Sequence, residues 1–143
     1  MLARVLAALL PRIIALVWAV WVIPTSYAYV GGAPIQLMAV EGLLHVPIWA
    51  VWALAAVFLI LGAAVPPKAP EWHQEVARWL RILGMTIVAM LLVMWGVSFF
   101  EADSARGWVT GKNYIFMGFL AACMTFIVGR DTATRGDVNA DVP

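Results

Sequence analysis

Glu41 and His45 are the residues of this chain whose types and spacing come closest to a chemical site. Residues four apart share one face of an α-helix, so the two side chains can form a hydrogen-bonded pair. Because the pKa of histidine is about 6.5, such a pair could sense protons, gate a path or contact another copy. The alternative is that both residues lie in a wet interface or serve packing alone. A metal ion needs at least three ligands and His73 is far from this pair, so no metal site is predicted.

The sequence lacks the motifs of the common enzyme classes. It has no glycine-rich phosphate loop, no HExxH and no Ser/His/Asp set that would share one side of a membrane, and Cys123 is its single cysteine. We therefore expect no enzyme activity, no catalytic residue and no cofactor. A net charge of +1 predicts no nucleic-acid binding. No apolar run carries a row of polar positions on one side, so one copy should form no selective ion path.

Four apolar runs must position these residues. The chain is 64% hydrophobic and 12% charged, whereas soluble domains are about 25% charged. The run from Leu43 to Val65 contains no Asp, Glu, Lys or Arg. As a helix it would be roughly 35 Å long, enough to cross a hydrocarbon core of about 30 Å.

The sequence therefore predicts an all-α fold, an integral membrane four-helix bundle over residues 1–130, in which short connections join the spans. The predicted spans are 13–30, 43–65, 82–100 and 113–129. A polar, charged tail over 131–143 is expected to be disordered.

A short interfacial helix is predicted before the third span. Trp72, Val76 and Trp79 recur at helical spacing, and charged residues fall largely on the other side. Pro70 suits the first position of a helix. The alternative is that these residues merely extend the third span into the cytoplasm.

Small residues recur along the fourth span at the spacing that lets helix backbones approach closely in lipid. They are Gly118, Ala121, Ala122, Thr125 and Gly129. We expect them to form helix-packing or oligomer contacts. The pattern favours packing within one chain, but the same spacing also suits contacts between copies.

The basic residues predict how the chain is oriented. With four spans, one side would carry seven of the nine basic residues: Arg4, Arg12, Lys68, Arg78, Arg81, Arg130 and Arg135. The other side would carry only Arg106 and Lys112. Because basic loops favour the cytoplasm, both termini are expected there. A competing interpretation is a secretory signal over residues 1–28, with cleavage after Ser26-Tyr27-Ala28.

Small size, closely connected apolar spans, the lack of a catalytic motif and a short charged tail together resemble a phage holin. The composition is similar to that of four-span membrane proteins of actinobacterial phage lysis cassettes. The resemblance implies a homo-oligomer in the cytoplasmic membrane of a bacterial host, with the lipid bilayer and an endolysin as its physical and functional partners. Gly118, Ala122, Thr125 and Gly129 would make the assembly contacts.

In such a role the protein would assemble cooperatively, collapse the proton-motive force and let the endolysin reach the wall. This end of the chain departs from the pattern, because residues 130–143 hold two arginines against three aspartates where holin tails are commonly basic. Two alternatives remain open. One is an accessory subunit of a larger membrane complex, and the other is a small channel or transporter in which Glu41 and His45 would act.

Overall fold

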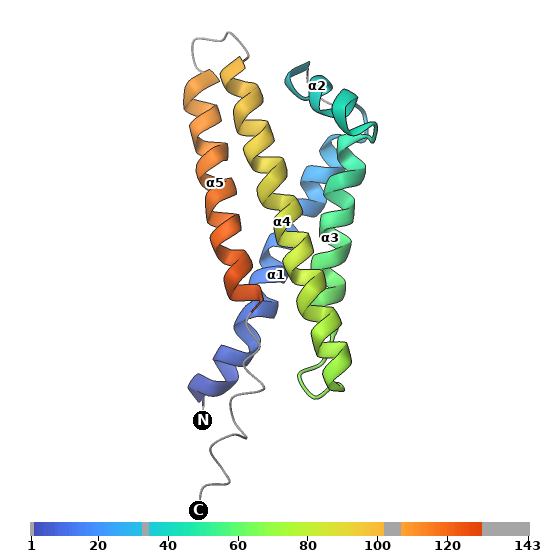
Figure 1. Ribbon diagram of the computed structural model, residues 1–143, viewed down its shortest axis with the longest axis vertical. Helices are drawn as coiled ribbons and strands as arrows, with labels where there is room; N and C mark the ends of the chain where they lie inside the picture. The colour runs from blue at the N-terminus through green and yellow to red at the C-terminus, as the bar shows by residue number, and fades with distance from the viewer. Residues whose placement is uncertain (1, 33–34, 102–106, 130–143) are drawn as a thin grey trace, which may run out of the picture.

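The computed structural model describes residues 2–32, 35–101 and 107–129 of the 143-residue chain. This part consists of five α-helices and their connecting turns, with no strand (Figure 1). The helices are α1 (Leu2–Ala28), α2 (Ile35–Leu44), α3 (Ile48–Ala64), α4 (Glu71–Glu101) and α5 (Gly107–Val128). The predicted all-α fold is confirmed. The predicted disordered tail, 131–143, lies outside the described residues.

Helix α1 continues through two prolines, Pro11 and Pro24. Proline lacks the N–H that would bond to the carbonyl four residues back, so the helix around it needs other donors. Beside Pro24, the hydroxyl of Thr25 donates to the backbone carbonyl of Trp21 at 2.9 Å. The predicted span was 13–30. Helix α1 begins well before this span, at Leu2, and ends two residues before the end of the span, at Ala28.

The second predicted span, 43–65, is not one helix. Helix α2 ends at Leu44 and α3 begins at Ile48. Pro47 disfavours a helical conformation in the residue before it, and His45 adopts φ 54°, in the left-handed region. Helix α3 thus has 17 residues and a length of about 25 Å. The prediction of one span over 43–65 rested on the absence of charged residues, which does not indicate where a helix breaks.

The separate interfacial helix predicted before the third span is not present as a distinct element. Helix α4 is continuous from Glu71 to Glu101, and Trp72, Val76 and Trp79 lie exposed on its first turns. The carbonyl of Pro70 accepts hydrogen bonds from the next turn, and residues 71–83 contain no proline or glycine that could break the helix. The structure therefore agrees with the alternative, in which these residues extend the third span.

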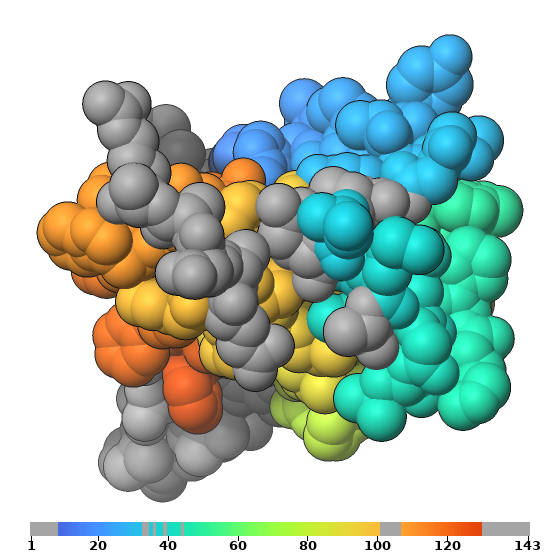
Figure 2. Space-filling model, turned by 90° about the horizontal axis from the view of Figure 1, so that it is seen from above, coloured from blue at the N-terminus to red at the C-terminus, as the bar shows by residue number. Residues whose placement is uncertain are grey.

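Helix α4 lies between α3 and α5 and packs against both, while α1 packs chiefly on α3 (Figure 1). Seen from above, α1 lies along one side of the other helices (Figure 2). By length and composition, α1 over Leu9–Ala28, α4 over Glu71–Phe100 and α5 over Gly107–Val128 could each cross a membrane. Helix α3 is apolar but shorter.

Candidate functional site

The carboxylate of Glu41 caps the helix that follows it. Its Oε1 accepts a hydrogen bond of 2.8 Å from the backbone N–H of Ile48, the first residue of α3. His45 is exposed, and its Nδ1 lies 3.2 Å from the carbonyl oxygen of Leu43. Neither of these bonds joins the two side chains, because His45 lies beyond the end of α2. The prediction rested on one continuous helix, so it missed the capping role.

Helices α4 and α5 approach each other closely along a seam of glycines. A Cβ built on Gly96 would lie 2.8 Å from the carbonyl oxygen of Gly111, and one built on Gly111 would lie 2.8 Å from that of Gly96. At Gly118 a Cβ would lie 2.8 Å from Val93 Cγ2, and at Gly129 it would lie 3.0 Å from the side chain of Ile82. Ala121 is fully buried. These small residues therefore pack within the chain.

Sequence reasoning missed Gly96 and Gly111, although both are central to this seam. The fourth span was expected to begin at residue 113, whereas α5 begins at Gly107. Gly111 and Gly118 are two helical turns apart and so share a face. With the earlier helix start, that spacing would have indicated the seam.

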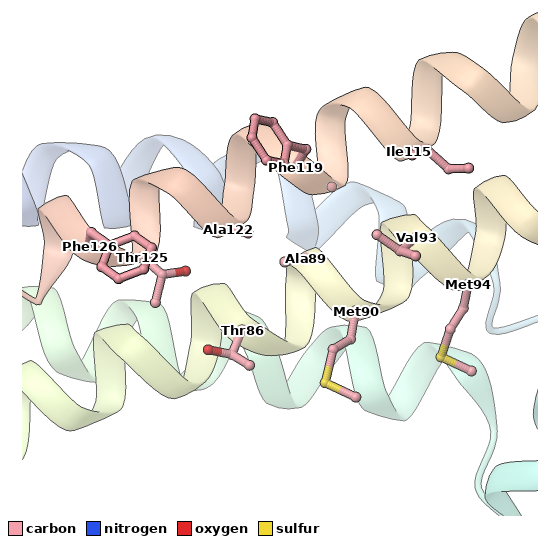
Figure 3. A pocket seen from close by; sticks show the side chains of 11 residues that line it. Thr86, Ala89, Met90, Val93, Met94, Ile115, Phe119, Ala122, Thr125 and Phe126 are labelled. Atoms are coloured by element: carbon pink, nitrogen blue, oxygen red, sulfur yellow. The ribbon is translucent and has the colours of Figure 1, made fainter.

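An apolar groove of about 640 Å³ runs along the outer side of the same seam (Figure 3). It is lined by Thr86, Ala89, Met90, Val93 and Met94 of α4 and by Ile115, Gly118, Phe119, Ala122, Thr125 and Phe126 of α5. Phe119 and Phe126 stand at its side with 66% and 77% of their surfaces exposed. Of the predicted contact residues, Ala122 and Thr125 therefore lie on this outer groove.

A chain of aromatic rings crosses the helices. Trp18 lies edge-on to Trp21 at 5.8 Å, Trp21 lies edge-on to Trp52 at 5.8 Å, and Trp52 lies 6.1 Å from Trp95. Trp95 in turn stacks on Tyr114 of α5 at 4.6 Å. These contacts join α1, α3, α4 and α5. Aromatic rings therefore make up much of the packing between these helices.

Arg81 joins three helices at the other end of the molecule from α2. Its side chain is buried, with 3% of the residue exposed. Its guanidinium donates to the carbonyl oxygen of Gly62 at 2.7 Å and to that of Val128 at 3.1 Å. Both carbonyls belong to the last turn of a helix, α3 or α5, where they lack intrahelical partners and where a cation is favourable.

No protein-family model matches the chain, and no curated protein or solved structure matches it. The resemblance to holins therefore stays a prediction.

The groove can accommodate an apolar partner, but the residues that line it have no ionisable or metal-ligating side chain. None of the eleven residues that line it is His, Cys, Asp, Glu, Lys or Arg. The hydroxyl of Thr125 donates to its own helix, at the carbonyl of Ala121, 3.1 Å away. A surface of this composition fits an apolar partner such as another helix or a lipid chain. The groove is thus a candidate contact surface and not a catalytic centre.

Proposed function

We propose that this chain is a holin-like protein that spans the cytoplasmic membrane of a bacterial host. It assembles there into homo-oligomers and permeabilises the membrane, so that an endolysin reaches the cell wall. Its apolar exterior supports the membrane location, since large apolar side chains are exposed on each long helix. Examples are Val20 at 70%, Leu61 at 52%, Met90 at 59% and Phe126 at 77%. A water-soluble protein rarely exposes apolar surface on this scale.

In this proposal α1, α3, α4 and α5 cross the bilayer and both termini are cytoplasmic. Helix α3, at about 25 Å, is somewhat shorter than a hydrocarbon core of about 30 Å. A short span is accommodated by local thinning of the bilayer at modest cost. The loop between α3 and α4 and the first turns of α4 then lie at the cytoplasmic face, where Lys68, Arg78 and Arg81 satisfy the preference for internal basic residues.

The observation that carries the proposal is the largely apolar interior of a single copy. In the described part of the chain, the buried polar or charged side chains are Ser26, Arg81 and Ser98. Each donates to a backbone carbonyl; Ser26 bonds to Trp49 and Ser98 to Trp95, both at 2.8 Å. The other buried side chains that the structure describes are apolar or aromatic, among them Trp95, so this interior offers few polar groups to water or ions. A permeation path must therefore form between copies, as cooperative assembly of a holin requires.

The surface best suited to that assembly is the outer side of α4 and α5. It combines a groove with exposed phenylalanines, so a second copy can insert rings where the first is hollow. In lipid, such shape complementarity is the main source of association, because burial from water contributes little.

Expression from a tightly controlled promoter in bacteria tests the proposal, with membrane potential and growth followed over time. We expect normal growth, then abrupt depolarisation, and lysis only when an endolysin is co-expressed. Ala122→Leu fills the groove and should lengthen the delay. Ala64→Leu makes the same change on the exposed side of α3 and should leave the delay unchanged.

Continued growth at high membrane levels of the protein would overturn the proposal. If the protein were also degraded unless a second protein was present, a role as accessory subunit would replace it. Selective flux of one solute through purified protein in liposomes, without lysis in cells, would instead indicate a transporter.

A further inference from the structure

Helix α2 lies at the end of the molecule opposite the loop between α3 and α4, beside the end of α4 and the beginning of α5 (Figure 1). It has ten residues, too few to cross a bilayer, and it packs on α4 and α3. The proposed orientation places this end on the outer side of the membrane. A short helix at this position lies either in water or in the outer part of the bilayer.

The outward face of α2 is apolar. Ile35, Met38 and Leu43 have 78%, 60% and 74% of their surfaces exposed. The charged residue of this helix, Glu41, is only partly exposed, and its carboxylate accepts the hydrogen bond from the N–H of Ile48. A helix that lies on the surface of a protein in water shows the opposite pattern, with polar residues outward and apolar residues toward the core. The direction of these side chains therefore favours lipid as the surroundings of α2.

The chain on both sides of α2 continues this apolar surface. Tyr27 and Val30 are exposed before the helix, and Val46 and Trp49 are exposed after it. From residue 13 to residue 40 the sequence contains no Asp, Glu, Lys or Arg. The outward face of α2 is thus continuous along the chain with the exposed apolar surfaces of α1 and α3, which face lipid in the proposed function.

The aromatic residues at this end indicate the level of the outer membrane boundary. Tyr27 at the end of α1 and Trp108 at the beginning of α5 are both exposed, and Nζ of Lys112 lies 4.7 Å from the ring centre of Trp108. Exposed tyrosines and tryptophans are typical of the boundary between hydrocarbon and headgroups, and a lysine near a helix end extends toward the headgroups.

The length of α3 places α2 near the same boundary. Helix α3 is about 25 Å long, whereas the hydrocarbon core is about 30 Å thick. When its last turn lies at the cytoplasmic boundary, its first residue, Ile48, therefore lies no further out than the outer edge of the hydrocarbon. Only residues 45–47 separate Ile48 from α2, so α2 cannot lie far from this edge.

We propose that α2 lies in the outer leaflet just below the headgroups and inserts Ile35, Met38 and Leu43 among the lipid acyl chains. These side chains would otherwise form an apolar patch in water. The helical conformation satisfies the backbone polar groups of α2 at this depth. Because α2 contains no Lys or Arg, its partner is the acyl chains and not an anionic headgroup. This inference rests on the proposed membrane location, but not on assembly or holin activity.

The test measures the depth of fluorophores attached to single cysteines of the full chain, in a Cys123→Ser background. Met38→Cys and Leu43→Cys place the label on the outward face of α2. Lys68→Cys places it in the exposed loop between α3 and α4, and Val20→Cys places it on the exposed side of α1, in the middle of its span. Each labelled protein is reconstituted into phosphatidylcholine vesicles at a low ratio of protein to lipid, with iodide on both sides or with nitroxide-labelled lipids as quencher.

The labels on α2 should be protected from water and close to lipid headgroups. Iodide should quench the labels at residues 38 and 43 several-fold less than the label at residue 68. A nitroxide attached to the acyl chain near the headgroup should quench the two α2 labels more strongly than a nitroxide near the end of the chain. The label at residue 20 should show the opposite preference between the two nitroxides, because it lies in the middle of a span.

Three results would overturn the inference. Iodide quenching at residues 38 and 43 equal to that at residue 68, with residue 20 protected, would place α2 in water and leave the membrane location standing. Protection from iodide without quenching by either nitroxide would show that protein, such as a second copy, covers this face. Iodide quenching at residue 20 as well would remove the membrane location itself. The two α2 positions check each other, since both side chains are exposed and a label at either leaves the packed core intact.

Discussion

The Nε of Arg81 donates a hydrogen bond of 3.1 Å to the backbone carbonyl of Val128, 47 residues further along the chain. The same guanidinium bonds to Gly62, so a single side chain satisfies the last turns of two helices. A Cβ on Gly62 would lie 2.7 Å from Arg81 Cγ, which explains why the arginine can approach this carbonyl. One buried charge thus holds the last turns of α3 and α5 against α4.

Replacing Arg81 with methionine should destabilise the fold by about 3 kcal/mol, because two carbonyls lose a charged donor in a buried place. Arg81→Lys should recover part of this, since one ammonium is a poorer match to two carbonyls. Thermal unfolding in detergent measures both. Lys112→Met, which removes an exposed cation, is the control. An equal loss of stability in this variant would contradict the role of Arg81 in joining the ends of α3 and α5.

The glycines of the α4–α5 seam should tolerate no side chain. Gly96→Ala places a Cβ 2.8 Å from the Gly111 carbonyl and should cost about 2 kcal/mol, through strain in the packed seam. Gly42→Ala is the matched control, since nothing lies within 4 Å of a Cβ there, and should be neutral or stabilising by up to about 1 kcal/mol. Equal unfolding midpoints for the two variants would show that α4 and α5 leave room for a Cβ at Gly96.

The helices were foreseeable from sequence because long uncharged runs have few alternatives to helix in lipid. Their ends were less foreseeable. Pro47 was a signal of a break in the predicted span that starts at Leu43, but the turn there also contains a left-handed His45 and a capping bond that the Ile48 N–H donates to Glu41. That bond spans seven residues, and no helical or strand period indicates it.

The polar contacts were harder to predict than the helices. Arg81 was expected on the polar side of an interfacial helix, yet it is buried because its partners are backbone carbonyls. Carbonyls are present at every residue, so the sequence does not reveal which ones lack a partner. The small residues of α5 were found, but only the three-dimensional seam separates Gly118, which packs inward, from Ala122, which lies on the outer groove.

Removing the Glu41 carboxylate should loosen the start of α3. Glu41→Ala leaves the Ile48 N–H without its acceptor and should cost about 1 kcal/mol, the value of a lost helix cap. Hydrogen exchange at the Ile48 amide should then accelerate by about fivefold. Glu41→Gln keeps a carbonyl oxygen and should exchange more slowly than Glu41→Ala. Indistinguishable exchange in all three proteins would assign Glu41 no capping role.

Cys123 allows the proposed assembly to be tested in membranes with the unaltered chain. It is exposed on α5, four residues after Phe119 and three before Phe126, so it shares their outer face. If two copies meet through this face in a symmetric pair, residues near the axis approach their own counterparts. Mild oxidation should therefore produce a disulfide-linked dimer, because cysteines that come within about 4 Å of each other at Cβ can be joined.

A second cysteine position distinguishes this contact from random collision. In a Cys123→Ser background, Val57→Cys places the thiol on the exposed side of α3, away from the groove, and should give little dimer. Phe119→Ala and Phe126→Ala should each reduce cross-linking through Cys123, because the groove of one copy then lacks the rings of the other to fill it. Equal cross-linking at both positions would mean that copies meet by crowding alone. The groove would then face lipid, and assembly would have to use another surface.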